Sequence, residues 1–510
     1  MKYDVIVVGA GSSGSVIASR VSEDPNKKVL LLDAGPDYSN IEETPYDLLN
    51  SHRNSLRDHD WGFNYEPTRG REVDFPRGRV TGGSSAVNTT IALRGMPEDY
   101  DEWSDLGNSE WSWNKVLPSF NRLERDLDFG DEDYHGDAGP ITIRRYPAAE
   151  MLPQHQAFLE SAKQLGYPDC PDANDPDSWG AGPQPMNKLG RLRISCAVGY
   201  LSAARIRPNL TIRGDTFARR LVIKGHRCSG VEIENPDGSV EVIEGRLVVV
   251  SAGSLMSPPL LMLSGIGPEQ QLQSHGIGVV VDEPGIGANL CDHPALSLVC
   301  QVKDGAFIDF DSPVIQTILR YTTEGSDKRN DMQIEQFSYA GKQGGPPMFG
   351  IAACLEYQYG RGEIRLRSAD PHDHPVIDCR FCEDDRDTAR LVKGFKDLLA
   401  ISQTGPLADM IETVIFPDPM RPLDDDGIAR LCRKLAGSGF HPCGTVKMGP
   451  IDDAMAVVDQ YGCSHRVDNL VVADASIMPF VPRANINLTS IMIGEKIGEW
   501  IRTGPGRYGL

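Results

Sequence analysis

Long hydrophobic runs and a net positive charge are both absent from this sequence of 510 residues. No stretch reaches the roughly 18 apolar residues that a membrane-spanning helix needs, so we expect no transmembrane segment. The first residues lack a basic segment followed by an apolar stretch and a cleavage site, and we therefore expect a cytoplasmic protein. The net charge is -21. An acidic surface repels phosphate backbones and anionic lipid, which argues against nucleic acid or a membrane as a partner.

A disulfide framework and a metal-ligand pattern are absent as well. The 11 cysteines are odd in number and widely scattered, which is typical of a reducing compartment. The close pair Cys379 and Cys382 has no second pair at zinc spacing, so we predict two partly buried thiols and no metal site. The chain is too long for one ordinary core, which predicts two domains.

A nucleotide-binding pattern opens the chain. An apolar run at residues 5–8 is typical of a buried parallel strand, and Gly9, Gly11 and Gly14 follow it with the spacing of the dinucleotide fingerprint. These glycines permit a tight turn, a close approach to a pyrophosphate and close packing of a helix on a strand. A second apolar run ends at Asp33, whose carboxylate could accept hydrogen bonds from a ribose. The pattern predicts dinucleotide binding but does not separate NAD from FAD.

The rest of the chain mixes sheet and helix patterns. The following segments carry the predictions: a β-meander at 208–254 with a turn at 235–238, a helix at 254–273, period-two strands within 295–370, amphipathic helices at 384–403 and 427–436, and an acidic solvated loop at 126–137. Since nucleotide-type segments lie at both ends and in the middle, we predict two domains that are each built from several chain segments.

Several segments resemble the glucose–methanol–choline (GMC) oxidoreductase family, and the resemblance runs over nearly the whole chain. They are residues 77–88 (RGRVTGGSSAVN), 253–267 (GSLMSPPLLMLSGIG), 284–293 (PGIGANLCDH), 441–449 (HPCGTVKMG), 471–479 (VVADASIMP) and 485–489 (NINLT). The resemblance implies an α/β fold, α+β overall, in which a Rossmann-like FAD-binding domain is interwoven with a substrate domain of antiparallel sheet and helices. We assign residues 1–150, 200–295 and 438–510 to the FAD-binding domain, and 151–199 and 296–437 to the substrate-binding domain.

The resemblance implies FAD as the cofactor. Some relatives carry a histidine bonded covalently to FAD where this chain has Val87, so we predict non-covalent FAD. The family usually has Glu where this chain has Asp33. The predicted cofactor-binding residues are Gly9, Gly11, Ser13, Gly14, Asp33, Ala34, Arg79, Gly82, Gly83, Ser84, Asn88, Thr90, Phe217, Ala252, Asp474, Ala475, Asn487, Leu488 and Thr489.

The resemblance also implies a catalytic pair. Removing a hydride from an alcohol carbon requires a base for the hydroxyl proton, and imidazole suits this role because its pKa lies near neutrality. His441 matches the catalytic histidine of the family, and we assign Asn487 as its partner facing the flavin. His293 is interpreted as a structural hydrogen-bonding residue.

The predicted substrate is a small-molecule alcohol, with oxygen or another electron acceptor taking the electrons. Polar residues between the nucleotide segments are candidates for substrate binding, and with His441 and Asn487 they are Arg94, Gln333, Glu335, Gln336, Glu356 and Gln358. Their number favours a sugar or glycoside, possibly oxidised at C3, although strand polar residues more often face solvent. Choline-type and aryl-alcohol-type dehydrogenases, a redox-silent FAD-containing lyase, a light-driven decarboxylase and a non-catalytic FAD-binding protein are the alternatives.

Overall fold

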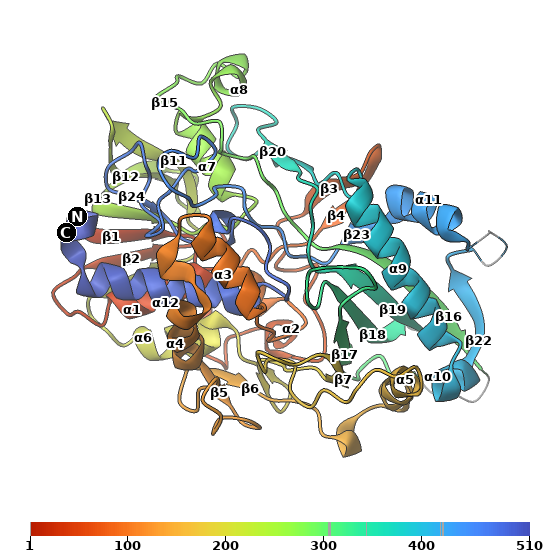
Figure 1. Cartoon of the computed structure of the whole chain (residues 1–510). Coiled ribbons are helices and arrows are strands. Elements are labelled where there is room, and N and C mark those ends of the chain that lie inside the picture. The colour runs from red at the N-terminus through yellow and green to blue at the C-terminus, as the bar shows by residue number, and fades with distance from the viewer. Residues whose placement is uncertain (1, 304–307, 343, 419, 421–422) are drawn as a thin grey trace.

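The computed structural model describes residues 2–510 except 304–307, 343, 419 and 421–422. It contains two large sheets, one toward each end of the molecule (Figure 1). Both termini lie together at the end that holds the first sheet. Within the described residues, no helix has the length and apolar character required to cross a membrane.

The first sheet has seven described strands in the order β10-β2-β1-β13-β12-β11, and β24 pairs with β13. Parallel pairing joins β10, β2, β1, β13 and β24, whereas β11 and β12 add an antiparallel extension. The strands are β1 (Tyr3–Val8), β2 (Val29–Leu32), β10 (Leu210–Arg213), β11 (Phe217–Lys224), β12 (Arg227–Glu234), β13 (Val240–Val250) and β24 (Leu470–Val472). The strand predicted at 5–8 is confirmed, and the predicted meander is confirmed for β11, β12 and β13, whereas β10 at its start pairs in parallel with β2 instead.

Helices α1 (Ser12–Val21) and α12 (Asn487–Thr503) lie side by side against this sheet (Figure 1). Gly494 allows the close approach, since a Cβ atom there would lie 2.8 Å from the carbonyl oxygen of Ser13. The first turns of both helices therefore open at the same edge of the sheet, although almost the whole chain separates them.

The second sheet has seven described strands in the order β22-β16-β19-β18-β17-β7, and β23 pairs with β16. Its described pairings are antiparallel. The strands are β7 (Gly180–Pro183), β16 (Pro294–Val302), β17 (Ile315–Tyr321), β18 (Met332–Ala340), β19 (Met348–Leu355), β22 (Ile411–Phe416) and β23 (Gly437–Ser438).

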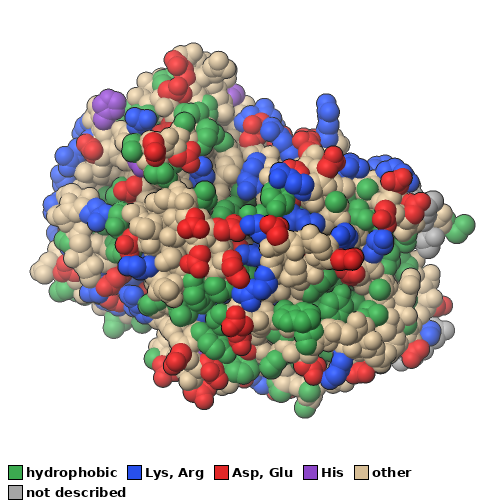
Figure 2. All heavy atoms as spheres, viewed as in Figure 1, with side chains coloured by type: hydrophobic (Ala, Val, Ile, Leu, Met, Phe, Trp, Pro, Cys, Tyr) green, Lys and Arg blue, Asp and Glu red, His purple; other side chains and the backbone are tan. Residues whose placement is uncertain are grey.

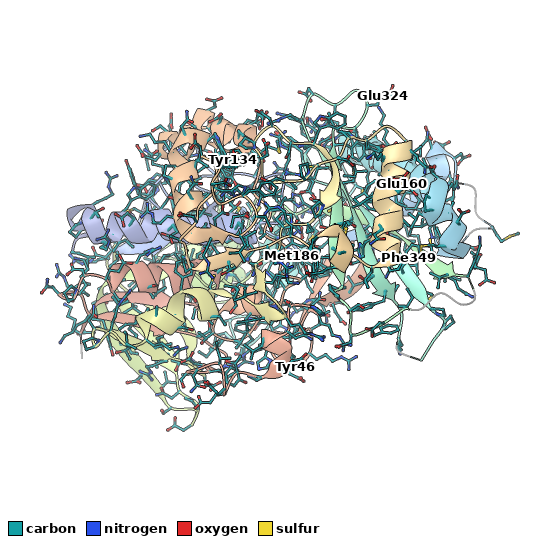
Figure 3. The ribbon with its side chains drawn as sticks, turned by 90° about the horizontal axis from the view of Figure 1, so that it is seen from below. Tyr46, Tyr134, Glu160, Met186, Glu324 and Phe349 are labelled. Carbon is teal, nitrogen blue, oxygen red and sulfur yellow. The ribbon has the colours of Figure 1, made fainter. Side chains whose placement is uncertain are left out.

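The two faces of the second sheet differ. Alternate residues such as Leu296, Ile334 and Ile351 pack in one apolar core with Phe158 of α5 and Phe395 of α9. The helices associated with this sheet are α5 (Pro153–Gln164), α9 (Asp385–Ser402), α10 (Gly405–Met410) and α11 (Asp425–Leu435). In Figure 3, Glu160 of α5 and Phe349 of β19 are both labelled at the end of the molecule that holds the second sheet. Because side chains alternate along a strand, the residues between these apolar positions face the first sheet.

Smaller elements complete the described structure. They are the four-stranded sheet of β3 (Phe63–Thr68), β4 (Arg71–Phe75), β20 (Glu363–Arg365) and β21 (Val376–Asp378), the strands β5 (Glu124–Asp126), β6 (Ile141–Ile143), β8 (Lys188–Leu189), β9 (Leu192–Arg193), β14 (Ile266–Gly267) and β15 (Val281–Asp282), and the helices α2 (Tyr46–Leu49), α3 (Pro97–Asp105), α4 (Trp113–Leu123), α6 (Ser202–Ala204), α7 (Ser257–Leu263) and α8 (Glu269–Ser274).

Two predictions about segments need correction. The single helix predicted at 254–273 is two short helices, α7 and α8, because Gly265 has φ +83° and a Cβ there would lie 2.5 Å from the carbonyl oxygen of Gly278. The acidic segment 126–137 is not simply a solvated loop, since Asp126 and His135 are buried. The helices predicted at 384–403 and 427–436 are confirmed as α9 and α11. The surface in Figure 2 shows acidic and basic side chains interspersed.

Candidate active site

A cavity of about 480 Å³ is lined by residues of both large sheets. The first sheet contributes the turn after β1, the end of β2 and the segment after β13, while the start of α12 closes one side. The second sheet contributes side chains of β16, β18 and β19. The cavity therefore contains both the predicted nucleotide site and the predicted catalytic residues.

The glycine fingerprint forms a narrow turn at the cavity wall. Gly9 has φ +97°, and a Cβ there would lie 2.4 Å from the carbonyl oxygen of Ser251. A Cβ on Gly14 would lie 1.9 Å from the carbonyl oxygen of Gly9, so Gly14 has a packing role. A Cβ on Gly11 would approach only the Cα of Gly83, at 4.0 Å. This open space beside the N-terminus of α1 can hold a phosphate, because helix N-termini present free N–H groups.

Asp33 lies at the end of β2 and lines the cavity together with Ala34. Its carboxylate accepts hydrogen bonds from the backbone N–H groups of Ala10, at 2.9 Å, and Gly35, at 2.8 Å. Burial raises the pKa of Asp33 to about 6. Each oxygen has a further lone pair that can accept a hydrogen bond from a ribose hydroxyl group.

The other predicted cofactor residues fall into two groups. Those that line the cavity are Ser13, Gly83, Ser84, Asn88, Phe217, Ala252, Asp474, Ala475 and Asn487. The described cavity lining does not include Gly14, Arg79, Gly82, Thr90, Leu488 or Thr489. Arg79 is exposed and lies over the ring of Trp61, and Thr489 is bonded to the hydroxyl of Tyr100. Gly82 donates its N–H to Ala10, which makes its role structural.

The carboxylate of Asp474 is occupied by hydrogen bonds within the protein, which limits its ability to contact the cofactor. One carboxylate oxygen accepts the hydroxyl of Ser257 at 2.6 Å and the N–H of Gly253 at 2.9 Å, and the other accepts the N–H of Ser476 at 2.7 Å. The carboxylate thus fixes two loops that line the cavity.

His441 follows β23 and lines the cavity. Its Nε2 lies 3.0 Å from Nδ2 of Asn485, which also lines the cavity. Burial, together with the neighbouring His293 and Arg77, holds the pKa of His441 well below its usual value. The imidazole is therefore neutral near pH 7 and able to accept a proton.

The predicted pairing of His441 with Asn487 needs correction. Oδ1 of Asn487 accepts the hydroxyl of Ser12 at 2.9 Å, so this side chain faces the first turn of α1. Asn485 lies beside His441 in its place. The reason is the start of α12, since Asn487 is its first residue and lies against α1, whereas Asn485 lies in the preceding loop.

The predicted substrate residues are also divided. Glu335 lines the cavity, and its Oε1 accepts Nε2 of Gln333 at 2.5 Å. Glu356 lies behind the cavity wall next to His293, with Nδ1 of His293 3.5 Å from its Oε2. Gln336 and Gln358 are buried but are not part of the cavity lining as described, and Oε1 of Gln358 accepts the N–H of Asp292.

The prediction for Arg94 was wrong. Its guanidinium donates to Glu124 and to the carbonyl of Tyr134, in a buried ionic cluster that includes His135. The nitrogens of His135 are bonded to Glu124 at 2.6 Å and Asp172 at 2.8 Å. Although Glu124, Asp126 and His135 could geometrically hold a metal ion, the adjacent arginines already balance the carboxylates. The expected absence of a metal stays a prediction.

Sequence profiles of the GMC oxidoreductase family match residues 3–295 and 358–494. The chain is a GMC oxidoreductase. It is therefore an FAD-dependent enzyme that acts on alcohol groups, and its fold class is that of the family.

Individual relatives match over nearly their full length. The 5-(hydroxymethyl)furfural oxidase of Methylovorus sp. (strain MP688) is 34% identical, with 98% of this chain and 99% of that protein covered. An oxygen-dependent choline dehydrogenase of Brucella anthropi is 35% identical, with 98% and 96% covered. The crystal structure of pyridoxine 4-oxidase from Mesorbium loti superposes with a TM-score of 0.90 at 29% identity, covering 97% of this chain and 98% of that one.

The cavity of this GMC oxidoreductase fits FAD. The glycine cradle at Gly11 and Gly83 leaves room for a pyrophosphate, and Nδ2 of Asn487 is buried without a hydrogen-bond partner among the described residues. An orphaned buried donor costs free energy unless a ligand or water accepts from it. Val87, the position of the covalent histidine in some relatives, lines the cavity and can form no such bond.

Sequence reasoning missed three residues of the site in this GMC oxidoreductase. Asn485 was within a quoted motif, and only the three-dimensional direction of the loop distinguishes it from Asn487. Asp292 accepts hydrogen bonds from the backbone N–H groups of His293, at 2.7 Å, and His441, at 2.8 Å. Arg77 lines the cavity, and its Nη2 is buried and has no partner among the described residues. Burial lowers the pKa of Arg77 to about 10.

Proposed function

We propose that this flavoenzyme oxidises the hydroxymethyl group of a small aromatic or heteroaromatic molecule. The observation that carries the proposal is the pair formed by Nε2 of His441 and Nδ2 of Asn485, 3.0 Å apart at the wall of the cavity that fits FAD. A hydroxyl oxygen placed between them can donate its proton to the imidazole and accept a hydrogen bond from the amide.

The chain supplies the proton chemistry. His441 takes the hydroxyl proton at Nε2, and Asn485 stabilises the negative charge that develops on the oxygen. FAD, when bound, accepts the hydride from the carbon. Burial of both side chains excludes water from the reacting atoms, which strengthens these electrostatic interactions.

The second sheet supports an aromatic substrate. The cavity residues contributed by β16, β18 and β19 are Ala295, Ser297, Glu335, Phe337, Ala352 and Cys354, and four of these six are apolar. Phe440, next to His441, adds another aromatic ring to the lining. Of the polar residues that favoured a sugar, only Glu335 lines the cavity. A furan-type alcohol of the kind named for the Methylovorus relative suits this lining.

A sugar or glycoside, with C3 as the candidate carbon, is the second candidate. Glu335 and Ser297 favour it, because both can hydrogen-bond hydroxyl groups at the substrate end of the cavity. The same carboxylate near Phe337 would also suit a choline-type cation. For the reoxidation step we propose oxygen as the electron acceptor, as for the Methylovorus oxidase and the oxygen-dependent Brucella dehydrogenase.

Anaerobic bleaching of the flavin tests these proposals. The purified holoenzyme is mixed with 5-(hydroxymethyl)furfural, an aryl alcohol, pyridoxine, choline, glucose and a glycoside, and flavin absorbance is followed. We expect fastest bleaching by 5-(hydroxymethyl)furfural or the aryl alcohol, and peroxide formation in air. Fastest bleaching by glucose or the glycoside would favour the second candidate. No bleaching by any alcohol would contradict the proposal and favour a redox-silent lyase.

The base is tested by His441→Asn. We expect the rate of flavin reduction to fall by about 100- to 10,000-fold, the range of general-base contributions. The FAD content should remain unchanged, since the side chain of His441 makes no described contact with the nucleotide-binding turn. A near-wild-type rate of flavin reduction would show that another group takes the proton.

A further inference from the structure

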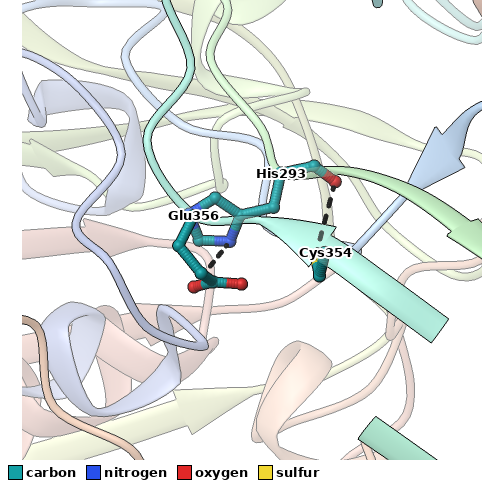
Figure 4. A group of neighbouring side chains, drawn as sticks. All are labelled: His293, Cys354 and Glu356. Atoms are coloured by element: carbon teal, nitrogen blue, oxygen red, sulfur yellow. Dashed lines mark hydrogen bonds and ion pairs between the residues drawn. The ribbon is translucent and has the colours of Figure 1, made fainter. Parts of the chain in front are cut away.

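A second histidine lies directly behind His441. Nδ1 of His293 is 2.9 Å from Nδ1 of His441, although the two residues are far apart in the sequence. His293 precedes β16, and Cys354 and Glu356 of the β19 region surround it (Figure 4). His293 and Glu356 are completely buried. The alcohol chemistry proposed above uses none of these three residues.

The backbone fixes the distance between the two imidazoles. Cys291 and Cys443 exchange backbone hydrogen bonds of 3.0 and 2.9 Å, and Gly439 donates its N–H to the carbonyl of His293 at 2.7 Å. Oδ1 of Asp292 also accepts hydrogen bonds from the backbone N–H groups of His293 and His441. The loop before β16 and the loop after β23 are thus joined on both sides of the imidazole pair.

A directed chain of hydrogen bonds sets the tautomer of His441. Burial raises the pKa of Glu335 to about 7, and above that pH its carboxylate only accepts, so it turns Nε2 of Gln333 toward itself. The same Nε2 lies 3.4 Å from Oδ1 of Asn485. Asn485 therefore presents Nδ2 to His441, and Nε2 of His441 must be the bare nitrogen that accepts.

The remaining proton follows from the chemistry of imidazole. A neutral imidazole carries one ring proton, so the proton of His441 is on Nδ1 when Nε2 is bare. Nδ1 of His293 lies 2.9 Å away and is the acceptor. Burial lowers the pKa of His293 to about 3, which keeps its ring neutral and able to accept.

We propose that His293 is a positioning residue for the oxidation: it accepts the Nδ1 proton of His441 and so keeps Nε2 of His441 free for the proton of the alcohol. This inference rests on the proposed function. In the reaction the O–H bond of the alcohol breaks, its proton bonds to Nε2 of His441, and the hydride leaves the carbon for FAD as the carbonyl forms. His441 then carries a positive charge, which its Nδ1–H shares with His293 in a charge-assisted hydrogen bond.

The charged groups around His293 affect the pH dependence. They are Glu356 and Cys354 in the β19 region, Asp292 on its own loop, His441 across the pair, and Arg77 and Glu335 at the cavity. Glu356 is the carboxyl group nearest to the ring, and burial raises its pKa to about 8. Its ionisation would stabilise the charged histidine pair.

The test compares two variants with a matched control. His293→Leu removes the acceptor, whereas His293→Asn places an amide oxygen near the position of Nδ1. The control is His155→Leu, since His155 is also completely buried but is bonded to Thr317 and Ser338 away from the described cavity lining. Anaerobic flavin reduction by 5-(hydroxymethyl)furfural is measured from pH 5 to 9, with FAD content and melting temperature.

We expect His293→Leu to slow the reduction of bound FAD by about 10- to 100-fold, the usual effect of removing an outer hydrogen-bond partner, and to shift the pH profile. His293→Asn should recover most of the rate, and His155→Leu should lower only the melting temperature. The proposal is overturned if His293→Leu reduces its bound FAD at the wild-type rate with the same pH profile, since that result indicates a purely structural role.

Nuclear magnetic resonance of the wild-type holoenzyme provides a second readout that needs neither substrate nor a stable His293 variant. With ¹⁵N-labelled histidine, ring-nitrogen shifts separate protonated from bare nitrogens, and His441→Asn identifies the signals of His441. We expect a proton on Nδ1 and a bare Nε2. A proton on Nε2 of His441 would overturn the inference about His293. The absence of flavin bleaching by any alcohol would instead contradict the proposed function, so the two failures can be told apart.

Discussion

Asn485 and Asn487 have the same side chain, but different surroundings give them different tasks. Asn485 contacts the base, and Asn487 contacts Ser12 at the nucleotide-binding turn. We expect Asn485→Ala to slow the reduction of bound FAD by about 100- to 1,000-fold, since one donor to the developing negative charge is lost. We expect Asn487→Ala mainly to weaken FAD binding. Stopped-flow reduction and FAD titration of the two apoproteins separate these effects, and equal effects on both measurements would contradict the assignment.

Glu356 affects stability as well as the histidine pair. Its two carboxylate oxygens are buried and have no hydrogen-bond partner among the described residues. Burial and the neighbouring Glu335 raise its pKa to about 8, from about 4.3 in an unfolded chain. Between these values the folded state holds a proton that the unfolded state releases, so the free energy of unfolding falls as pH rises.

Glu356→Gln should remove this loss of stability. We expect the urea midpoint of the variant to gain on that of the wild type as pH rises from 6 to 8, and the difference to level off above pH 8, where Glu356 is ionised in both states. Urea unfolding at three pH values measures the difference. Parallel pH dependences of the two midpoints would show that Glu356 does not titrate as its burial implies.

At single positions, the sequence predicts which residues belong to a motif better than it predicts where their side chains point. Gly9, Gly11, Asp33 and His441 line the cavity because their places follow from a strand–turn–helix pattern or a long motif. Arg94 was misplaced because its partners Glu124 and His135 are distant in sequence and no local pattern pairs them. Glu335 lies on β18 and Glu356 directly follows β19, and the sequence could not show which of the two faces the cavity.

Among the elements, the turn at residues 82–83 is the one that sets the space for the pyrophosphate. Gly83 has φ +52°, and a Cβ there would lie 2.6 Å from the Cα of Gly11. We expect Gly83→Ala to force this turn away from α1 and to reduce FAD affinity by about tenfold or more, equivalent to about 1.4 kcal/mol. Titration of the apoprotein with FAD measures the change.

Gly190→Ala is the matched control for this turn. Gly190 has φ +59°, so its backbone strain is similar, but no atom lies within 4 Å of the added Cβ. The control should lower stability by about 1 kcal/mol and leave FAD affinity unchanged. If both variants lost FAD equally, general backbone strain and not the approach to Gly11 would be the cause.

Helices with a regular apolar period were predictable, and interrupted ones were not. The apolar stripe of α9 packs on the second sheet and that of α11 packs on α9, and their predicted ranges agree with the structure. The segment 254–273 has an equally apolar composition, but the positive φ of Gly265 is imposed by its contact with the segment around Gly278. A long-range backbone contact of this kind leaves no local signal in the sequence.

At the scale of the whole molecule, the chain returns repeatedly to the same cavity. Residues near 9, 83, 252, 335, 441 and 487 all line it. The apolar runs predicted the interwoven arrangement, whereas the boundaries at residues 150, 200, 295 and 438 stay predictions. Met186, near the middle of the view in Figure 3, packs in a small core with Leu93 of the first half and Ile318 of the second sheet. Contacts of this kind connect the two halves of the fold.

A cofactor held by so many segments should stabilise the entire chain. A ligand that binds only the folded state raises its stability by RT ln(1 + [L]/Kd), which is about 2.7 kcal/mol at 100 times Kd. We therefore expect the melting temperature of the apoprotein to rise steadily with added FAD. Because Val87 lines the cavity where some relatives carry a bonded histidine, heating or acid should release all the FAD. After centrifugation the yellow colour should be in the supernatant, and colour that stays with the precipitated chain would show a covalent bond.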